Sequence, residues 1–394
     1  MVLTTDELEQ FTATARQFID KRLIPIEQQV DLDENIDADL WKSLVAESAE
    51  LGFYTANVPE SLGGPGLTVS EQTRLWEEFG RTSWTFSYLL ARPHRALMSC
   101  NEDQRQRFLE PVMSGEKEAC FALTEPGAGS DNSAMSTRAE KVDGGYRITG
   151  SKHFISHGDA DIAVVFAVTG PPLRGRTPQI TAFIVEKATP GYTVGRVQRM
   201  MGWNGMHEHE LLFDDCFVPN DQVLGEPGQG LKIALTSVAL RRLQIAAHCV
   251  GAMNRLVDVT VDYVRNRVAF DHPLSDKQGV QWKLADIALD AHISREAVRS
   301  AAEACDRARA EGKTDLQLSS LLGKEISIAK LQASTALNRV VDVAVQLHGG
   351  MGWAKETVVE RLYRDARAFR IVEGADEVHR TIISRALLAE AAKH

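Results

Sequence analysis

The sequence predicts an α+β protein that is mainly α-helical, with a small antiparallel β-sheet or barrel between two helical parts. Apolar residues recur at helical spacing in the first and last parts of the chain. Only the middle part is rich in short runs of Val, Ile, Thr and aromatic residues bounded by Gly, Pro and Asp. No helix-length segment separates these runs, which argues against a parallel doubly wound sheet. We therefore expect three domains, residues 1–120, 121–230 and 231–394.

The N-terminal part carries clear helical signals. Thr4 followed by Glu7 fits a capping box, which marks the start of a helix. The apolar residues that follow on one helical face are Leu8, Phe11, Ala15 and Phe18. Pro25 is expected to end or kink this helix, and a second helical pattern covers residues 39–51. The turn-rich segment 58–67, VPESLGGPGL, can approach another group closely because of its glycines.

The middle part carries the strand signature in five runs. They cover residues 145–156, 161–169, 179–187, 192–200 and 210–219. From residue 231 the pattern is helical again. One apolar stripe at helical spacing comprises Leu322, Ile326, Ala329, Ala333, Ala336, Val340, Val343 and Leu347. Another stripe comprises Leu284, Ile287, Ala288 and Ala291, and residues 308–315, ARAEGKTD, form a charged turn between two long antiparallel helices.

Composition and charge narrow the function classes. The 394 residues carry a formal net charge of −10 without a long basic block, which argues against nucleic acid and anionic membranes as partners. No apolar stretch reaches 18 residues, and the N-terminus lacks a secretory pattern, so no membrane insertion is expected. Five widely spaced cysteines without C-x-x-C indicate reduced thiols. A small-molecule enzyme fits best, either cytoplasmic or in the mitochondrial matrix after transit-peptide removal.

Several common enzyme motifs are absent from the sequence. No G-x-G-x-x-G follows a strand, and neither a complete P-loop, a G-x-S-x-G elbow nor H-E-x-x-H occurs. His207 and His209 flank Glu208, but two histidine ligands are too few for a metal site, so no metal is expected. A structural or substrate-facing role is the favoured interpretation of these two histidines.

Six motifs occur in order along the chain. Gly127 and Gly129 in the first of them belong to a loop whose backbone N–H groups can face an anion or a polar ring edge. The motifs are FALTEPGAGSD (121–131), GSKHFIS (150–156), FVP (217–219), NRVAF (266–270), QLHGGMGW (346–353) and VEGADEVHR (372–380). This ordered set resembles the acyl-CoA dehydrogenase family of flavoproteins. The resemblance covers nearly the whole chain, from segment 58–67 to the C-terminal helix.

The resemblance implies an N-terminal helical domain, a middle β-domain and a C-terminal four-helix bundle, in agreement with the hydrophobic patterns. It implies FAD between the β-domain and the bundle, with the adenine end reaching a neighbouring subunit. It also implies a homotetramer arranged as a dimer of dimers. An acyl-CoA is the implied substrate, and an electron-transfer flavoprotein is the implied electron acceptor.

The resemblance assigns cofactor contacts to several segments. The residues expected along the flavin ring and its pyrimidine edge are Phe121, Leu123, Thr124, Gly129 and Ser130. The residues expected on the other side of the ring are Phe154, which replaces a common Trp, Ile155 and Ser156. The FAD pyrophosphate and adenine are assigned to Arg267, Phe270 and Gln278, since Arg offers an always-charged planar fork. The turn assigned to the ADP part comprises Gln346, Leu347, Gly349 and Gly350. Ala375 and Glu377 complete the expected cofactor contacts.

Glu373 is the candidate catalytic base. Removing an α-proton from a thioester needs a positioned base in a dry site, and donors at the carbonyl where negative charge develops. The resemblance places the family's glutamate at Glu373, with its backbone N–H at the thioester carbonyl and hydride transfer to flavin N5. Gly374 leaves room for the substrate. Ser130 would lie near the thioester and the pantetheine, and Arg242 would contact the CoA arm.

The sequence also departs from the family pattern. Ala375 stands where E-G-T would place a hydroxyl at the flavin, and Ala239 replaces a common acidic residue before Arg242. Residues 376–379, DEVH, resemble a branch acting on long or unusual acyl chains. The segment MGWNGMHEHEL replaces the commoner M-G-x-R-G-S type, which leaves open a contact of His207 or His209 with a polar acyl group.

Two other functions remain as alternatives. A flavin oxidase or monooxygenase on the same fold would react with O₂, but it needs no carboxylate at Glu373. A non-catalytic, DNA-associated relative is disfavoured by the net charge of −10. The sequence therefore favours an FAD-dependent acyl-CoA dehydrogenase that forms a trans-2-enoyl-CoA, with the acyl chain and the direction of the reaction left open.

Overall fold

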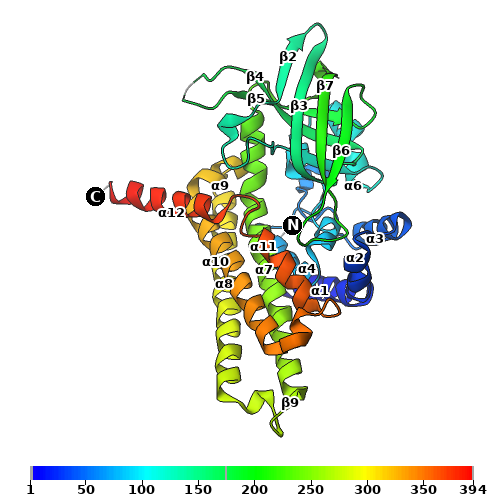
Figure 1. The fold of residues 1–394 in the computed structure, drawn as a ribbon. Helices are drawn as coiled ribbons and strands as arrows, with labels where there is room; N and C mark the ends of the chain where they lie inside the picture. The colour runs from blue at the N-terminus through cyan, green and yellow to red at the C-terminus, as the bar shows by residue number, and fades with distance from the viewer. Residues whose placement is uncertain (1–2, 174, 393–394) are drawn as a thin grey trace.

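A computed structural model describes residues 3–173 and 175–392, and it has helices at both ends of the chain around a central sheet (Figure 1). The helices are α1 (Thr5–Phe18), α2 (Glu27–Asp33), α3 (Ala38–Glu50), α4 (Val69–Phe79), α5 (Glu102–Gln104), α6 (Glu110–Met113), α7 (Gly230–Asn266), α8 (Gln278–Ala310), α9 (Asp315–Leu321), α10 (Gly323–His348), α11 (Val358–Ala368) and α12 (Asp376–Ala391). This order confirms the predicted α+β class with a mainly helical chain. Within the described residues, none of the helices is long and apolar enough to cross a bilayer.

The N-terminal helices begin where the sequence predicts. The Thr4 side chain accepts from the Glu7 N–H and the Glu7 carboxylate accepts from the Thr4 N–H, which completes the expected capping box. The Pro25 region is helical but irregular: α1 continues into a π-helical turn, Ile19–Leu23, and a 3₁₀ turn, Ile24–Ile26. The proline sits in the first turn of the 3₁₀ segment, where its missing N–H costs little.

The central sheet is larger than the five predicted strands. Its strands are β1 (Ala119–Ala122), β2 (Arg138–Val142), β3 (Gly145–Ser156), β4 (Ile162–Gly170), β5 (Gln179–Glu186), β6 (Tyr192–Gln198), β7 (Glu208–Pro219) and β8 (Val223–Leu224). The order is β6-β7-β3-β2-β4-β5-β8, with β1 beside β4. Most pairs are antiparallel, as expected, but β1–β4 and the single β2–β4 register pair are parallel. The short strands β1, β2 and β8 lack the long apolar runs on which the prediction depended.

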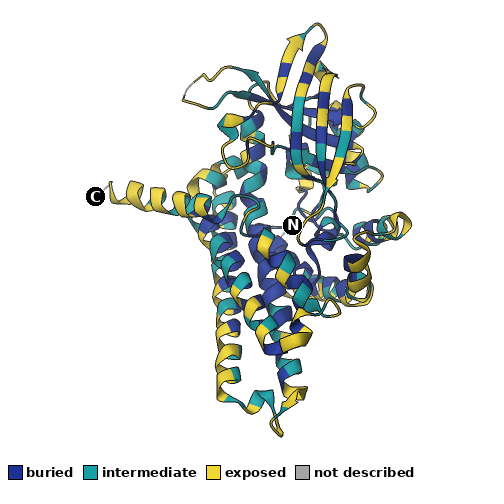
Figure 2. Cartoon of the chain, viewed as in Figure 1, coloured by how far each residue is buried: buried dark blue, intermediate teal, exposed yellow. Residues whose placement is uncertain are grey.

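The C-terminal part is built on the long helices α7, α8 and α10, with α11 and α12 packed on α10. A small hairpin of β9 (Val268–Ala269) and β10 (His272–Pro273) connects α7 to α8 at the end of the bundle farthest from the sheet (Figure 1). The turn predicted at 308–315 is confined to residues 311–314, because α8 continues to Ala310 and the short helix α9 begins at Asp315, before α10. Helix α12 projects from the bundle and is largely exposed (Figure 2).

The N-terminal helices and the bundle share one hydrophobic core, whereas the sheet has a separate core on each face. Helices α4 and α7 cross closely because glycines stand at the crossing point. A Cβ atom on Gly251 would overlap the Glu77 carbonyl oxygen, and one on Gly80 would overlap the His248 carbonyl oxygen. This close contact fixes α7 against the N-terminal helices and sets the position of the side chains along α7.

Candidate active site

Glu373 lies in the loop between α11 and α12, where three elements converge. Its backbone has φ +52°, and Gly374 follows with φ +98°. The Arg242 Nε atom on α7 donates to the Glu373 carbonyl oxygen at 2.9 Å. The Lys330 Nζ atom on α10 donates to the Gly374 carbonyl oxygen at 2.9 Å. A positive φ is uncommon for a residue with a side chain, and such strain persists where surrounding groups hold it in place.

The surroundings of Glu373 shift the pKa of its carboxyl group. Burial raises the pKa of Glu373, and the nearby cations Arg241, Arg242 and Lys330 oppose that rise without cancelling it. A carboxyl group with a raised pKa is a stronger base in its ionised form than an ordinary one. The position combines a strained, doubly held backbone with a perturbed carboxyl group, which is typical of a functional residue.

Lys330 is a site residue that the sequence analysis missed. Its side chain is 0% exposed, and burial lowers its pKa to about 8. A buried lysine is uncommon unless it is paired, and the partner here is a backbone carbonyl beside Glu373. The available signal was a lysine directly after Ala329 in the apolar stripe of α10, where a charged side chain interrupts a buried helix surface.

Gly374 is tightly surrounded. A Cβ atom on it would lie 3.3 Å from His379 Nε2 and 3.4 Å from the Arg242 Nη2 atom. Burial lowers the pKa of His379 to about 3, so this ring is neutral near pH 7. With φ +98° as well, position 374 disfavours any side chain, and glycine there lets His379 and Arg242 approach the backbone next to Glu373.

The two segments expected along the flavin ring lie side by side where β1 and β3 end. The His153 N–H donates to the Thr124 carbonyl at 2.9 Å, which joins segment 121–130 to the end of β3. Beneath them, Lys152 and Glu125 form a buried ion pair with 2.8 Å between Nζ and Oε1. Burial opposes ionisation, but Lys152 and hydrogen bonds lower the pKa of Glu125 to about 2. This buried pair holds the two segments in register.

The surface above this ion pair fits a flat, polar-edged ring. Phe154 is 52% exposed at φ +55°, so its face is presented to solvent rather than to the core. Gly129 and Ser130 are exposed, and within the described residues their backbone N–H groups donate to no other group. Phe121 and Leu123 are half-buried at the end of β1, whereas Ile155 is buried. An exposed aromatic face beside free backbone donors is compatible with bound FAD.

Ser156 has a protein partner instead of a free hydroxyl. Its Oγ atom donates to the Glu208 Oε1 atom at 2.7 Å. Burial raises the pKa of Glu208. The flanking histidines are also engaged: the His207 Nε2 atom lies 3.1 Å from the Glu34 carbonyl oxygen, and the His209 Nδ1 atom accepts from the Gly158 N–H. These contacts support the structural interpretation of both histidines.

The residues assigned to the pyrophosphate and adenine lie far from Glu373 in the single chain. Arg267, Phe270 and Gln278 are exposed at the β9–β10 end of the bundle, opposite the sheet (Figure 1). The turn after α10 approaches the same end, because the Tyr263 hydroxyl donates to the His348 carbonyl at 3.1 Å and the two rings stack. Gln346, Gly349 and Gly350 are exposed there, and Leu347 is buried. One chain therefore presents two separate halves of the expected cofactor site.

Two further observations concern the remaining candidates. Ala375 is the N-cap residue of α12 and has no capping side chain, while Glu377 is exposed beside Arg380. A cavity of about 290 Å³ lies between the end of α2 and segment 197–207, away from Glu373. No cluster of three His, Cys, Asp or Glu side chains suited to a metal ion occurs in the part of the chain that the structure describes.

Comparison with known proteins identifies the family. Three models match in succession: the N-terminal domain of acyl-CoA dehydrogenase over residues 5–116, the middle domain over 120–216 and the C-terminal domain over 228–388. The chain belongs to the acyl-CoA dehydrogenase family. This family of oxidoreductases is FAD-dependent, and the oxidase or monooxygenase alternative is not favoured.

Individual relatives agree with the family assignment. The human mitochondrial short-chain specific acyl-CoA dehydrogenase is 36% identical, over 95% of this chain and 88% of its own. The acryloyl-CoA reductase (NADH) of Anaerotignum propionicum is 34% identical, over 98% and 95%. Both alignments span nearly the whole of this acyl-CoA dehydrogenase family member.

Solved structures of the family have the same fold. The butyryl-CoA dehydrogenase of Megasphaera elsdenii matches with a TM-score of 0.85 and 33% identity, covering 98% of this chain and 99% of that one. An FAD-complexed acyl-CoA dehydrogenase of Bacillus anthracis matches with a TM-score of 0.89 and 28% identity, covering 99% and 68%. A chain from a study of the electron transferring flavoprotein of Acidaminococcus fermentans matches with a TM-score of 0.86 and 32% identity, covering 98% of both chains.

Proposed function

We propose that this acyl-CoA dehydrogenase uses Glu373 to remove the α-proton of an acyl-CoA thioester, giving the trans-2-enoyl-CoA. The observation that carries the proposal is the Glu373 loop, in which a carboxyl group of raised pKa stands on a backbone held by Arg242 and Lys330. Bound FAD supplies the acceptor for the β-hydride. The chain's own residues bind and orient the thioester and take up the proton.

Each part of the Glu373 loop has a separate task in this proposal. The carboxylate takes the α-proton, and the Glu373 backbone N–H donates to the thioester carbonyl as negative charge develops there. Arg242 and Lys330 hold the carbonyls of Glu373 and Gly374, which restrains the loop on the C-terminal side of that N–H. Gly374 keeps the approach free of a side chain.

The base assignment is tested by anaerobic mixing of the purified yellow protein with acyl-CoA thioesters. The wild-type protein should lose its flavin absorbance band on addition of a substrate. The Glu373→Gln protein should keep FAD and its colour, but its rate of bleaching should fall by a factor of about 10²–10⁴, the range for a positioned base. A fully active Glu373→Gln protein would refute the assignment.

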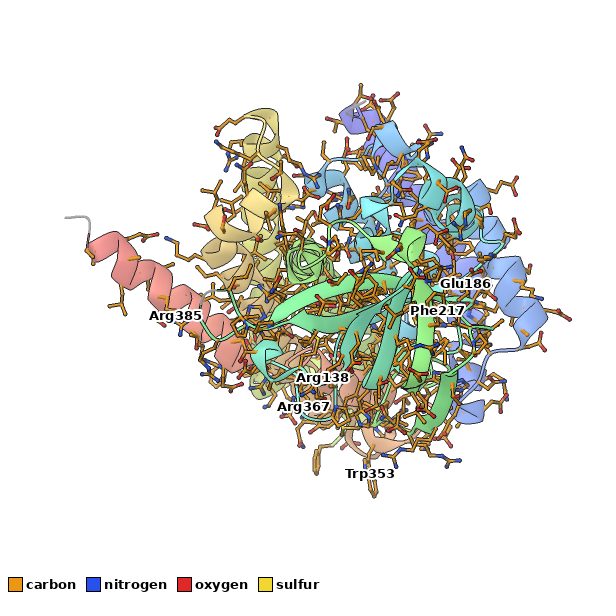
Figure 3. The ribbon with its side chains drawn as sticks, turned by 90° about the horizontal axis from the view of Figure 1, so that it is seen from above. Arg138, Glu186, Phe217, Trp353, Arg367 and Arg385 are labelled. Carbon is orange, nitrogen blue, oxygen red and sulfur yellow. The ribbon has the colours of Figure 1, made fainter. Side chains whose placement is uncertain are left out.

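We assign the ADP half of FAD to Arg267, Phe270, Gln278 and the turn 346–350, with each cofactor shared between two chains of a homotetramer. The support is the separation of these residues from Phe154, and the exposure of large apolar side chains around them. Phe270 is 89% exposed and Trp353 is 84% exposed, with Trp353 pointing away from the body of the chain (Figure 3). Such exposure is typical of an interface.

Oligomeric state and FAD retention test this assignment together. Light scattering after size exclusion should give a tetramer for the wild-type protein. Phe270→Ser should weaken both assembly and FAD binding, whereas Leu173→Ser, a change at another exposed apolar residue in the sheet domain, should affect neither. A monomer that retains FAD would contradict the shared site.

The acyl chain, acceptor and compartment complete the proposal. Relatives named for short-chain and butyryl substrates favour a short acyl chain, and the match to the Acidaminococcus study favours an electron-transfer flavoprotein as acceptor. A reducing compartment, the cytoplasm or a mitochondrial matrix, fits the five free cysteines. Reduction of a purified electron-transfer flavoprotein in the presence of substrate tests the acceptor, and cell fractionation tests the compartment.

A further inference from the structure

Arg241 is a half-buried cation that the proposed mechanism does not use. It precedes Arg242 on α7, and its guanidinium carbon lies 5.0 Å from the ring centroids of both Trp76 and Trp84. Its Nη1 atom donates to the Gln244 Oε1 atom at 3.3 Å. Within residues 3–173 and 175–392, no carboxylate forms a salt bridge with it. The aromatic rings satisfy its faces, but most of its five N–H donors point at no anion.

Arg241 is one of three cations near Glu373, with Arg242 and Lys330, and a fourth cation, Arg92, lies near Arg241 itself. Arg241 differs from the other three. Arg242 donates to the Glu373 carbonyl, Lys330 to the Gly374 carbonyl, and Arg92 to the Ala119 carbonyl. Each of these three therefore holds a piece of backbone in place. In the part of the chain that the structure describes, Arg241 holds no backbone carbonyl. A role in local architecture thus accounts for three of the cations and leaves Arg241 unexplained.

The surroundings of Arg241 are basic or neutral apart from Glu373. Burial lowers the pKa of Arg241, which Tyr88 and Glu373 partly restore and Arg92 lowers further. Burial and Arg241 lower the pKa of His248 to about 3, and burial with Arg241 and Arg92 holds the pKa of His94 well below its usual range. These histidines are neutral near pH 7. Glu373 is thus the carboxylate that acts on Arg241, and it faces three cations although the net charge of the protein is −10.

Positive charge that is partly withdrawn from water is costly unless an anion compensates it, and Arg241, Arg242 and Arg92 are half-buried beside the buried Lys330. Under the proposed function, the acyl chain of the substrate must pass Glu373, since that carboxylate reaches the α-carbon. A group on the acyl chain therefore comes close to Arg241. The planar guanidinium fork binds a carboxylate through two parallel hydrogen bonds, and the rings of Trp76 and Trp84 reduce competition from water.

We propose that the preferred substrate carries a second carboxylate at the far end of its acyl chain, and that Arg241 binds this carboxylate. The enzyme is then selective for CoA monothioesters of short dicarboxylic acids over plain fatty acyl-CoA of equal length. This inference rests on the proposed function, because it uses the passage of the acyl chain past Glu373. Arg241 selects the substrate by binding its second carboxylate, and Glu373 removes the α-proton.

Matched pairs of substrates test the proposal on the FAD-containing enzyme. Anaerobic flavin bleaching is measured with succinyl- and butyryl-CoA, glutaryl- and pentanoyl-CoA, and adipyl- and hexanoyl-CoA. Within each pair only the terminal methyl is replaced by carboxylate. The wild-type enzyme should prefer the carboxylate member of at least one pair by about 100-fold or more in kcat/KM, which corresponds to a charge-assisted contact.

Substitution of Arg241 should remove this preference. Arg241→Met keeps the apolar stem between the tryptophans, and it should lower the carboxylate preference at least 100-fold. Arg241→Lys retains a charge without the fork and should lower it by a smaller factor. Arg307→Met serves as the matched control, because this arginine is exposed on α8 beside Glu303. The visible spectrum of each variant reports whether FAD is retained.

The possible outcomes separate this inference from the proposed function. A wild-type enzyme that bleaches with plain acyl-CoA and prefers it in every pair would overturn the role of Arg241 but leave the dehydrogenase assignment intact. An Arg241→Met variant with equal losses on both members of a pair would also overturn it, since Arg241 would then serve the base. Absence of bleaching with every thioester would refute the proposed function, and this inference with it.

Discussion

Glu373 combines three features: a strained left-handed backbone, a carbonyl that accepts a hydrogen bond from Arg242, and a carboxyl group with a raised pKa. The φ of +52° costs free energy that two hydrogen bonds from distant helices offset. The same arrangement aims a backbone N–H and a carboxyl group from one residue. Local sequence explains why Gly374 follows, but the cations that hold the loop come from α7 and α10, about 130 and 40 positions away.

The raised pKa of Glu373 predicts the pH dependence of catalysis. The base works only when ionised, so activity falls as the pH drops through its raised pKa. The acid limb of the kcat/KM profile should therefore lie above the value of about 4.3 that is usual for a glutamate. A profile of kcat/KM against pH checks this, and a limb at or below the usual value would contradict it.

The raised pKa of Glu373 also predicts how folding stability depends on pH: activity should rise with pH, whereas the contribution of Glu373 to stability should fall. A carboxyl group with a raised folded-state pKa binds more protons in the folded than in the unfolded protein, so its stability contribution declines as the pH rises through that window. Glu373→Gln removes this penalty. At neutral pH the variant should unfold at the same or a higher temperature than the wild-type protein, which separates loss of catalysis from loss of fold.

Lys330 is predicted to position the base and to tune its charge. Lys330→Met leaves the Gly374 carbonyl unpaired and should destabilise the fold by about 1–3 kcal/mol. It also removes a cation that lowers the pKa of Glu373, so the acid limb of the kcat/KM profile should move to higher pH. A merely structural lysine would leave the pH profile unchanged. Urea unfolding and the pH profile of the same variant measure the two effects.

At the scale of elements, the start of α12 shows how a helix end and the site are coupled. Ala375 is the N-cap at φ −61° and ψ 159°, a backbone suited to a capping hydroxyl that alanine lacks. Helix α12 begins directly after the Glu373–Gly374 turn. A more stable helix start should therefore make that turn more stable as well. Arg370 and Asp376 brace the same loop through an ion pair of 2.8 Å.

A capping side chain should stabilise this helix start. Ala375→Ser should raise stability by about 1 kcal/mol, because its Oγ atom can accept from the first N–H groups of α12. Thermal unfolding of the FAD-containing protein measures the change. The control is Ala389→Ser, which makes the same change at an exposed position within α12 and should be neutral or slightly destabilising. Equal effects at both positions would contradict a capping origin.

At the scale of the whole molecule, buried charge joins the N-terminal helices to the bundle. Glu27 on α2 is 2% exposed and accepts from Arg255 Nη1 on α7 at 2.8 Å and from Arg361 Nη2 on α11 at 2.6 Å. Burial alone would raise the pKa of Glu27, but the two guanidinium groups outweigh it and lower the pKa. Its contribution to stability is therefore present at neutral pH and is lost as the pH falls through the lowered value.

Removing this carboxylate should destabilise the whole chain. Glu27→Gln leaves two buried guanidinium groups without an anion, which costs about 3–5 kcal/mol. The urea midpoint at pH 7 measures the loss. The matched control is Glu296→Gln, whose exposed pair with Arg299 on α8 should change stability by less than about 1 kcal/mol. A Glu27 variant no weaker than this control would show that the network contributes little.

Much of the fold could be predicted from the sequence, because its signals are local. The capping box at Thr4, the long strand runs and the apolar stripe of α10 each depend on residues near one another in the chain. Short strands such as β2 were missed, since their hydrogen bonds to β3 and not their own composition make them strands. The predicted boundaries at residues 120 and 230 stay predictions.

The sequence by itself determined the helix–sheet–helix order, the family and the candidate base, because motif spacing and hydrophobic periodicity can be read along the chain. Only the tertiary structure decided what surrounds Glu373. Lys330, Arg241 and Arg242 meet the loop because α7, α10 and the α11–α12 connection converge there. Electrostatic energy depends on distance and burial, and neither quantity is encoded in the spacing of residues along the chain.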